Sequence, residues 1–330
     1  MTQQVPYPLR FEPIYEYRLW GGRQLGGLLT EPLPGNSPIG EAWVLSDRGD
    51  FQSRVADGSL KGRTISELLA QFPEQVMGRL AGRFHRFPLL LKFLDAHEML
   101  SVQVHPSDAH PDLLPAGETG KTEAWVVLEA GPQSLIYSGL QPGTTEVSLR
   151  QALTNGGVKD RLACFTPAPG DAVFTPAGTV HALGGDLVVF EVQQNSDVTF
   201  RLYDWNHIDA TTGKPRALQV DQALACIDFG EHAGGLVAPL VEGATPVKRE
   251  RLFHCEQFRL SRLQGDAPFA VGGPGAPRVL VCIGGAGQIE QGGAAYPVAK
   301  GNVFLLPAAI GACTFQPRGA VTVLEIEIPE

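Results

Sequence analysis

The sequence predicts a mainly β protein with antiparallel strands and a few helices in the first two thirds of the chain. The 39 glycines and 26 prolines amount to 65 of the 330 residues. This share lies above the ordinary ~12% but below that of disordered chains, which indicates many tight turns. Most apolar runs have the length of a strand and end at glycine or proline, and helical patterns are few.

Strand and helix signals can be placed along the chain in order. Thr64-Ile65-Ser66-Glu67 matches a capping box, and the ~15 residues after it carry helical apolar spacing. Residues 145–163 and 219–226 are two further helix candidates. The clearest strand signals are apolar or alternating runs at residues 41–46, 89–94, 124–128, 187–192, 279–283 and 321–328.

A faint internal repeat is visible between the two halves of the chain. Residues 170–177 resemble residues 301–308, which lie 131 positions later, and on this register His181 corresponds to Ala312. The repeat indicates a duplicated β fold whose second copy has lost a histidine. The alternative is a coincidence between two strands rich in glycine and proline.

The chain is expected to form two domains. The polar, weakly patterned stretch at residues 230–248 is typical of a connection, and the sequence beyond it consists almost only of strand and turn signals. We therefore predict a larger domain with added helices over residues 1–235 and a smaller β domain over residues 236–330.

Charge and cysteine content narrow the possible partners and the compartment. The formal net charge of −9 argues against nucleic-acid or anionic-membrane binding. No run reaches the ~18 apolar residues that a membrane span needs, and the N-terminus lacks a signal-peptide pattern. The five cysteines are scattered without a CxxC pair, which favours a reduced, cytoplasmic setting and argues against a thiolate zinc site.

One predicted strand carries three polar side chains on a single face. In residues 100–105 three apolar residues alternate with Ser101, Gln103 and His105. Because successive strand side chains point to opposite faces, the amide of Gln103 and the imidazole of His105 could both reach a metal ion bound over that face. An ordinary half-exposed strand is the alternative interpretation.

Two further segments offer possible ligands. Lys121 and Glu123 share a face if residues 120–125 are extended, although a surface ion pair is the commoner role of such a pair. Residues 172–175 form a predicted strand that ends in a Pro/Gly turn and delivers His181 between small and apolar residues. A histidine satisfied within the core is the usual alternative at such a position.

Gln103, His105, Glu123 and His181 form a coherent set of metal ligands. Neutral imidazole nitrogens with oxygen donors suit zinc or another first-row divalent ion, and argue against calcium or magnesium. With a single anionic ligand, such an ion keeps a formal positive charge. That charge would polarise a carbonyl or alkoxide and stabilise an enediolate.

Two charged residues lie in other predicted strands. Glu191 stands in a mostly apolar run, where a carboxylate is costly unless it is paired or used, and burial would raise its pKa towards that of a useful base. Arg201 lies in the alternating run at residues 198–203. An internal ion pair between Glu191 and Arg201 is the alternative to a role in chemistry.

Several segments in this order resemble the type I mannose-6-phosphate isomerases, particularly their shorter bacterial form. The combination of QVHP, GKTE and PAGTxHA motifs is specific, whereas any one of them alone would not be. The matching segments are Trp20-Gly21-Gly22 and residues 88–106, 120–130, 176–183 and 195–205.

The resemblance implies a cupin (jelly-roll) metalloenzyme with a smaller, degenerate C-terminal cupin-like domain that lacks metal ligands. It also implies one zinc ion per chain and a cytoplasmic enzyme that acts on a hexose phosphate as a monomer or homodimer. Carried over by position, the family's zinc ligands fall on Gln103, His105, Glu123 and His181.

The resemblance also assigns residues around the metal. The family's active-site arginine falls on Arg201, and Ser101 and Lys121 fall where the family contacts substrate. Glu191 stands where a buried acid has been considered for proton transfer. Some members carry a basic residue a few positions after the arginine, whereas this chain reads Asp204-Trp205-Asn206-His207.

These assignments predict that the protein interconverts mannose 6-phosphate and fructose 6-phosphate through a cis-enediol. Lys121 and Arg201 would hold the phosphate or the developing oxyanion, and Glu191 would move the proton. Three alternatives stay open at this stage. They are a cupin Fe(II) oxygenase, a non-catalytic sugar-phosphate-binding protein with two cupin domains, and a purely structural metal site.

Overall fold

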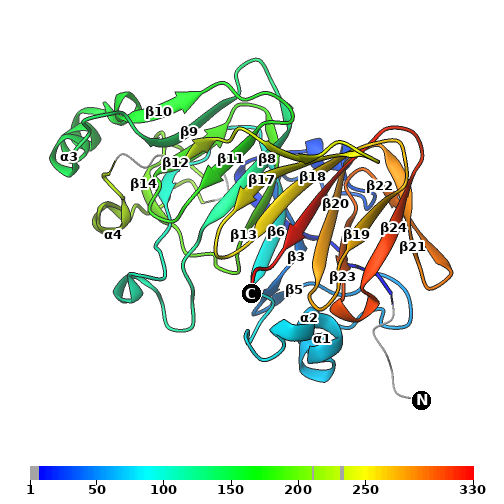
Figure 1. Ribbon diagram of the computed structural model, residues 1–330. Helices are drawn as coiled ribbons and strands as arrows, with labels where there is room; N and C mark the ends of the chain where they lie inside the picture. The colour runs from blue at the N-terminus through cyan, green and yellow to red at the C-terminus, as the bar shows by residue number, and fades with distance from the viewer. Residues whose placement is uncertain (1–6, 210–211, 231–233) are drawn as a thin grey trace.

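Four antiparallel sheets are stacked as layers in the computed structural model (Figure 1). The described residues are 7–209, 212–230 and 234–330, so part of the expected connection at 230–248 lies outside them. The mainly β fold with helices added in its first two thirds is confirmed. The six predicted strand runs coincide with β3, β6, β8, β13, β20 and β25 to within a few residues.

Residues 14–236 form a seven-stranded and a five-stranded sheet, which enclose one apolar core. The seven-stranded sheet has the order β15 (Gly235–Leu236), β11 (Ala172–Thr175), β8 (Glu123–Ala130), β13 (Leu187–Gln194), β6 (Leu89–Ala96), β2 (Ile14–Gly22) and β3 (Ile39–Leu45). The five-stranded sheet has the order β10 (Leu162–Phe165), β9 (Leu135–Leu140), β12 (His181–Gly184), β7 (Val102–Val104) and β14 (Phe200–Tyr203).

Residues 240–327, called the second half, form another sheet pair, to which the N-terminal strand β1 also belongs. Its seven-stranded sheet has the order β1 (Leu9–Arg10), β23 (Val303–Leu306), β20 (Arg278–Gly284), β25 (Val321–Glu327), β18 (Arg259–Gly265), β17 (Lys248–His254) and β16 (Leu240–Gly243). The four-stranded sheet has the order β19 (Phe269–Gly272), β24 (Ala312–Pro317), β21 (Ala286–Gln291) and β22 (Ala294–Ala299). A short hairpin joins β4 (Asp47–Arg48) to β5 (Phe51–Gln52).

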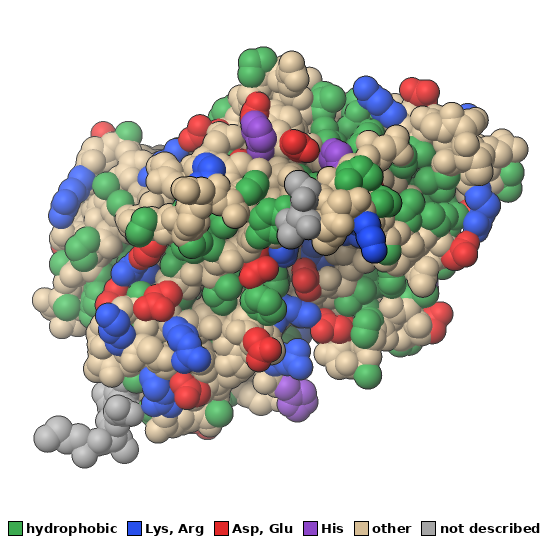
Figure 2. Space-filling view, turned by 180° about the vertical axis from the view of Figure 1, so that it is seen from behind, with side chains coloured by type: hydrophobic (Ala, Val, Ile, Leu, Met, Phe, Trp, Pro, Cys, Tyr) green, Lys and Arg blue, Asp and Glu red, His purple; other side chains and the backbone are tan. Residues whose placement is uncertain are grey.

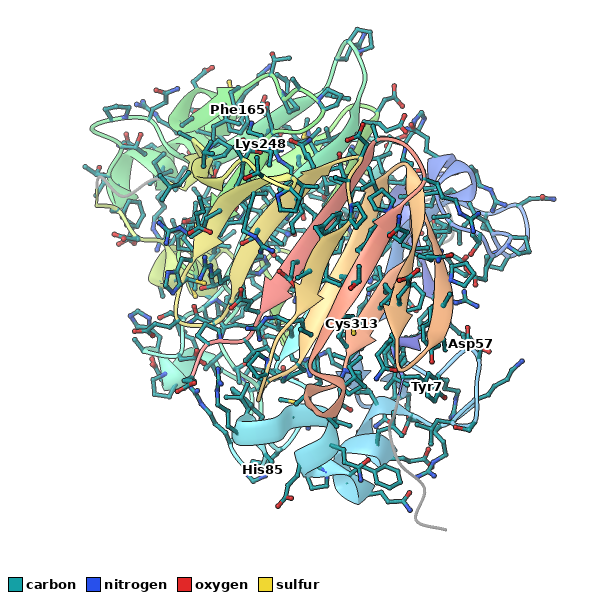
Figure 3. All side chains as sticks on the ribbon, turned by 45° about the vertical axis from the view of Figure 1, so that its right-hand side comes forward. Tyr7, Asp57, His85, Phe165, Lys248 and Cys313 are labelled. Carbon is teal, nitrogen blue, oxygen red and sulfur yellow. The ribbon has the colours of Figure 1, made fainter. Side chains whose placement is uncertain are left out.

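The N-terminal segment is anchored on the second half of the chain. Tyr7 stacks on Tyr296 of β22, with ring centroids 6.3 Å apart, and its hydroxyl donates to the carbonyl of Asp57 (Figure 3). Because β1 pairs with β23, the N-terminal segment supplies one strand to the sheet that residues 240–327 otherwise form. The domain boundary between residues 235 and 236 stays a prediction.

The capping box predicted at Thr64 is confirmed, but the helix after it is broken. The Thr64 hydroxyl accepts from the amide of Glu67, and the carboxylate of Glu67 accepts from the amide of Thr64. Helix α1 (Ile65–Gln71) ends at Phe72, and α2 (Pro73–Met77) begins at its proline. Proline supplies no amide for a continuing helix, so it favours a new start.

The other two helices also occur, one of them shorter than expected. Helix α3 (Glu146–Asn155) ends because Gly156 adopts a left-handed φ of 80°, the usual conformation of a glycine cap. The helix predicted through residue 163 is wrong over residues 156–163, where a 3-10 turn (Val158–Arg161) leads into β10 at Leu162. Helix α4 (Val220–Cys226) matches its prediction. Both helices cover the outer face of the five-stranded sheet.

The two seven-stranded sheets pack face to face, and this contact decides which side chains enter the first barrel. On β13, Val188, Phe190 and Val192 belong to the core between these sheets. Strand alternation therefore turns Val189 and Glu191 towards the interior of the first sheet pair. The same alternation on β6 and β8 places further polar side chains beside Glu191.

The second barrel is filled by apolar side chains. Phe269, Leu280, Ile289, Phe315 and Val323 form the centre of its core, and each is almost fully buried. The repeat predicted from sequence has a structural counterpart, since β23 begins 131 residues after β11 and β24 begins 131 residues after β12. The second of these strand pairs places Ala312 at the position of His181.

The molecular surface carries charges of both signs. Seen from behind, Lys and Arg side chains are interspersed with Asp and Glu side chains over the whole visible face (Figure 2). Among the described residues, none of the helices combines the length and the apolar composition that a membrane span requires.

Truncating Phe190 tests the contact between the two large sheets. Its side chain is fully buried and its ring lies 5.5 Å from that of Phe93. We expect Phe190→Ala to lower the free energy of unfolding by about 3–5 kcal/mol, measured by urea denaturation, because a large cavity is left in the core. Val147→Ala on α3, where the residue is 68% exposed, should change it by less than about 0.5 kcal/mol. If Phe190→Ala lowered the free energy of unfolding as little as this control, the assignment of Phe190 to the core between the two large sheets would be contradicted.

Candidate metal centre and active site

The four predicted metal ligands converge at one end of the first barrel. His181 is the first residue of β12 and lies opposite Gln103 of β7 in the ladder, while Glu123 begins β8 and His105 follows β7 directly. The ligand atoms of His105, Glu123 and His181 all lie within 4.8 Å of one another. Nε2 of Gln103 lies 3.3 Å from Nε2 of His181. These side chains could hold a metal ion.

Backbone carbonyls fix the orientation of both imidazoles. Nδ1 of His105 lies 2.8 Å from the carbonyl of Val198, and Nδ1 of His181 lies 2.9 Å from that of Thr179. If each Nδ1 donates its proton there, the lone pair of each Nε2 faces the cluster, as a metal ligand requires. Burial lowers the pKa of both rings, with that of His181 falling to about 4, so both are neutral and available as ligands at pH 7.

Glu123 has the properties of a carboxylate that binds a cation. The side chain is 1% exposed, and neither of its oxygens has a hydrogen-bond partner among the described residues. Burial alone would raise its pKa, but Lys121, His105 and His181 together hold the pKa well below its usual range. The Lys121 ammonium offsets part of the cost of burying an ionised carboxylate whose oxygens accept no hydrogen bond, and a divalent cation would offset more of it. The residues present therefore fit a metal ion.

Lys121 is part of the same cluster. Its Nζ lies 2.8 Å from Oε2 of Glu123 and 3.1 Å from Nε2 of His105. The ion pair between Lys121 and Glu123 that the sequence allowed is present, but it is buried rather than at the surface. A buried ammonium group provides a positive charge that solvent screens weakly.

Glu191 lies on the inner face of β13, and one of its oxygens accepts no hydrogen bond from the described residues. In the sheet, Glu191 lies opposite Lys92 of β6 on one side and opposite Trp125 of β8 on the other. Nε1 of Trp125 donates to Oε2 at 2.8 Å, whereas Oε1 has no hydrogen-bond partner among the described residues. Its ion partner there is Lys92, at 3.7 Å, and not Arg201. Burial, followed by the negative charge of Glu123, raises the pKa of Glu191 to about 7.

Lys92 is a buried site residue that the sequence reasoning did not single out. Its Nζ lies 3.5 Å from Oε2 of Glu41 and 4.7 Å from the centre of the Trp43 ring. Burial alone would lower its pKa, but Glu41, Asp197 and Glu191 raise it, so the ammonium stays charged. A lysine within the apolar run of residues 89–94 was the available signal, since lysine is rarely buried without a partner.

Ser101 and Arg201 extend the site along β7. Nε of Arg201 lies 3.2 Å from Oγ of Ser101, and that hydroxyl lies 3.3 Å from Oε1 of Gln103. Nη1 of Arg201 donates to the carbonyl of Ala217 at 2.9 Å. Hydrogen bonds thus connect the arginine to the ligand cluster by way of one strand face.

All these groups surround one pocket of about 280 Å³ inside the first barrel. Among the sequence-predicted site residues, six line it directly, and His105 and His181 stand beside Glu123 in the ligand cluster. The predicted residues that line it are Ser101, Gln103, Lys121, Glu123, Glu191 and Arg201.

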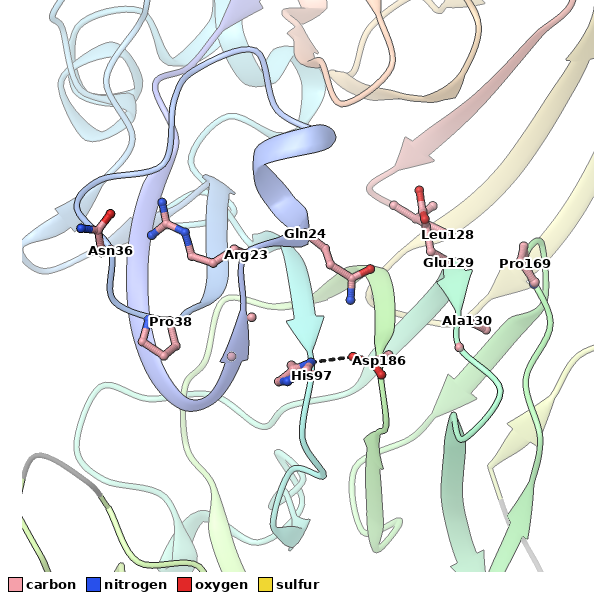
Figure 4. A pocket seen from close by; sticks show the side chains of 13 residues that line it. Arg23, Gln24, Asn36, Pro38, His97, Leu128, Glu129, Ala130, Pro169 and Asp186 are labelled. Atoms are coloured by element: carbon pink, nitrogen blue, oxygen red, sulfur yellow. Dashed lines mark hydrogen bonds and ion pairs between the residues drawn. The ribbon is translucent and has the colours of Figure 1, made fainter.

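A larger, open cavity of about 890 Å³ lies elsewhere on the protein (Figure 4). It contains an exposed pair of His97 and Asp186, whose Nδ1 and Oδ1 atoms are 2.5 Å apart. None of the predicted site residues lines this cavity. The predicted site residues gather instead at the smaller pocket.

The sequence is similar to proteins of one family. Residues 9–121 match the family model described as the catalytic domain of type I phosphomannose isomerase. The mannose-6-phosphate isomerase ManA of Bacillus subtilis is 34% identical over 92% of this chain and 94% of its own. The mannose-6-phosphate isomerase of Streptococcus mutans is 32% identical over 93% of this chain and 95% of its own.

Solved structures share the same fold. The crystal structure of the mannose 6-phosphate isomerase from Bacillus subtilis superposes with a TM-score of 0.88 at 29% identity, covering 97% of this chain and 99% of that chain. A mannose 6-phosphate isomerase bound with zinc and yttrium superposes with a TM-score of 0.74 at 16% identity, covering 98% of this chain and 100% of that chain. The expected jelly-roll fold is therefore confirmed.

Removing the carboxylate of the ligand cluster tests whether the cluster binds metal. We expect the purified protein to retain about one divalent ion per chain after dialysis and Glu123→Ala to lose it, because two neutral imidazoles alone bind the ion weakly. Metal content is measured by mass spectrometry. His97→Ala removes a histidine that also has a carboxylate partner but is 57% exposed, and it should keep the ion. Full metal content in Glu123→Ala would refute the assignment.

Proposed function

The chain belongs to the type I phosphomannose isomerase family, and from this premise we propose that it interconverts mannose 6-phosphate and fructose 6-phosphate. The reaction moves a proton between two adjacent sugar carbons by way of a cis-enediol. One observation carries the proposal. The pocket holds a buried carboxylate, Glu191, one oxygen of which has no hydrogen bond among the described residues, beside a cluster of side chains suited to a cation.

The ion proposed for the cluster is zinc, with one ion per chain. His105, Glu123 and His181 would hold it, with Gln103 as the fourth ligand, because neutral imidazoles and oxygen donors suit this metal. When bound, zinc supplies a Lewis acid that favours negative charge on the sugar oxygens. The remaining steps are the work of the protein's own side chains.

Glu191 is proposed to carry the proton between C1 and C2. Its raised pKa matches the requirement for a base that takes up and returns a proton near neutral pH. The indole of Trp125 fixes Oε2 and leaves Oε1 towards the pocket. Lys92 lies 3.7 Å away and would stabilise the ionised form before the proton is taken.

Cationic side chains are proposed to bind the substrate. Lys121, beside the ligand cluster, would stabilise negative charge that develops at the reacting oxygens, and Arg201 with Ser101 would bind the phosphate. The cytoplasmic location fits five cysteines that are all free. The monomeric or homodimeric state, and the absence of nucleic-acid and membrane partners, stay predictions.

A coupled assay on purified protein tests the proposed function directly. We expect mannose 6-phosphate to be converted to fructose 6-phosphate, activity to be lost on treatment with a chelator, and activity to return when zinc is added. Binding of hexose phosphate in calorimetry without turnover would instead indicate a binding protein. Uptake of oxygen by an iron-loaded sample would indicate an oxygenase.

The pH dependence of turnover tests Glu191 as the base. The base must be ionised, so kcat/KM should fall as the pH drops through the pKa of Glu191 in the free enzyme. That pKa is about 7 when no metal ion is bound at Glu123, and a bound metal ion would lower it by neutralising the charge of Glu123. We therefore expect the acid limb to lie above the ordinary carboxyl value of ~4.3 and no higher than about 7.

Glu191→Gln should lower kcat by about 10²–10⁴-fold and leave metal content unchanged, because it removes the base but no ligand. The matched control is Glu129→Gln on the neighbouring strand β8, where the side chain is 56% exposed and pairs with Lys300 at 3.1 Å. The control should retain full activity and the same acid limb. A Glu191→Gln enzyme with near-normal kcat would remove Glu191 from the mechanism.

A further inference from the structure

A second arginine reaches the pocket from a part of the chain that the motifs do not cover. Arg216 lines the pocket of about 280 Å³ together with Arg201. His207, six residues after Arg201, does not line this pocket. Its ring nitrogens lie 3.8 Å from Glu98 and 3.7 Å from Asp204. Arg216 is therefore the second arginine on the Arg201 side of a pocket whose other cationic residues are Arg18, Lys92 and Lys121.

The chain between the two arginines turns back sharply. After β14, Trp205 and Asn206 both adopt left-handed φ angles, of 53° and 60°, which are uncommon for residues other than glycine. Nε1 of Trp205 donates to the carbonyl of Leu100 at 2.6 Å and anchors the turn beside β7. The amide of Asp209 donates to the carbonyl of Lys214 at 3.0 Å, so the chain returns to the pocket at Arg216. Such strained turns persist where the surroundings enforce them.

Asp204 holds Arg216 in a fixed orientation. Nε of Arg216 lies 2.8 Å from Oδ2 of Asp204 and Nη2 lies 2.5 Å from Oδ1, so the contact is bidentate. The Asp204 side chain is 7% exposed and that of Arg216 is 20% exposed. Two parallel hydrogen bonds specify direction as well as charge. Nη1 of Arg216 has no partner among the described residues and is free for a ligand.

Arg201 is held by contacts with Ser101 and Ala217, and one nitrogen of its guanidinium group has no hydrogen bond to the described residues. Its Nε and Nη1 atoms contact Ser101 and Ala217, and among the described residues Nη2 has no partner and no carboxylate lies within ion-pair distance of the guanidinium. Burial, and then the nearby charge of Arg216, lower the pKa of Arg201. Asp204 thus pairs with Arg216 alone, Arg201 has no carboxylate within ion-pair distance, and the local excess of positive charge at the two guanidinium groups favours an anion there.

The position of the two arginines matches one end of a sugar phosphate. Ser101 contacts Arg201, and Gln103, two residues further along β7, contacts His181 of the ligand cluster. Side chains two residues apart on one strand face are roughly 6–7 Å apart. A hexose phosphate carries its reacting carbons at one end and its phosphate at the other, so the pocket offers complementary groups at both ends.

We propose that Arg201 and Arg216 together bind the phosphate of the substrate, and that Asp204 is the positioning residue of Arg216. The pair makes the site selective for phosphorylated over free hexoses. This inference rests on the proposed function for the identity of the substrate. Two guanidinium groups can bind inorganic phosphate in the same way as the phosphate of a sugar. Inorganic phosphate is therefore a direct probe of the arginine pair.

Steady-state kinetics of the zinc-loaded enzyme tests the pair. Arg216→Gln should raise KM for mannose 6-phosphate, and the inhibition constant of inorganic phosphate, by about tenfold to hundredfold, with a much smaller change in kcat. Asp204→Asn should raise both constants by about threefold to tenfold, because Arg216 keeps its charge but loses its orientation. Arg216→Lys should fall between the wild type and Arg216→Gln, since a point charge replaces a planar fork.

The matched control is Arg278→Gln in the second barrel. Arg278 is also mostly buried, at 13% exposed, and pairs with a carboxylate, that of Glu327, at 3.1 Å. It should change neither constant. Wild-type values of both constants in a folded Arg216→Gln protein would overturn the proposal. If that variant does not fold, wild-type values in Arg216→Lys and Asp204→Asn would do so.

Calorimetry with inorganic phosphate separates this inference from the proposed function. We expect the wild-type protein to bind phosphate at least tenfold more tightly than Arg216→Gln, whether or not the protein turns over a sugar. Weaker binding in the variant without isomerase activity in the wild type would overturn the proposed function alone. Equal phosphate binding in an active isomerase would overturn the arginine pair alone.

Discussion

The contact between the two seven-stranded sheets is the constraint on which the site depends. Because that contact buries Phe190 and its apolar neighbours on one face of β13, strand alternation must direct Glu191 into the first barrel. Register then places Lys92 and Trp125 on either side of it. The positions of the inner polar groups therefore follow from apolar packing on the opposite face, and a shift of one residue in register would exchange the two sets.

Charge compensation explains how so many ionised groups remain inside one barrel. Lys92 stands between Glu41 and Glu191, and Lys121 stands beside Glu123. Burial alone would raise the pKa of Glu41, but Lys92 and Arg18 lower it to about 2. Glu191 keeps a raised pKa because desolvation and the charge of Glu123 outweigh its cationic neighbours. The same interior thus holds two ionised carboxylates, Glu41 and Glu123, and one that can exchange a proton, Glu191.

Local sequence patterns predicted the features that depend on neighbouring residues. The period of two in residues 100–105 and the Pro/Gly turn before His181 predicted the positions of three of the four proposed ligands, because strands and turns impose those geometries directly. Lys92 and Arg216 were not predicted, since their roles arise only when distant strands and a long return loop meet. The helix expected over residues 145–163 ends earlier, at Asn155, because Gly156 adopts a left-handed cap conformation that stops it.

The pairing of β1 with β23 has a consequence for the order of folding. The partner of Leu9 is Leu305, so the first strand of the chain is completed by one of the last. During synthesis on the ribosome, all residues between Leu9 and Leu305 must emerge before this pair can form, and the loop that it closes is correspondingly long. Until then, the nascent N-terminal edge is exposed to premature association with other chains, a vulnerability that chaperones commonly limit.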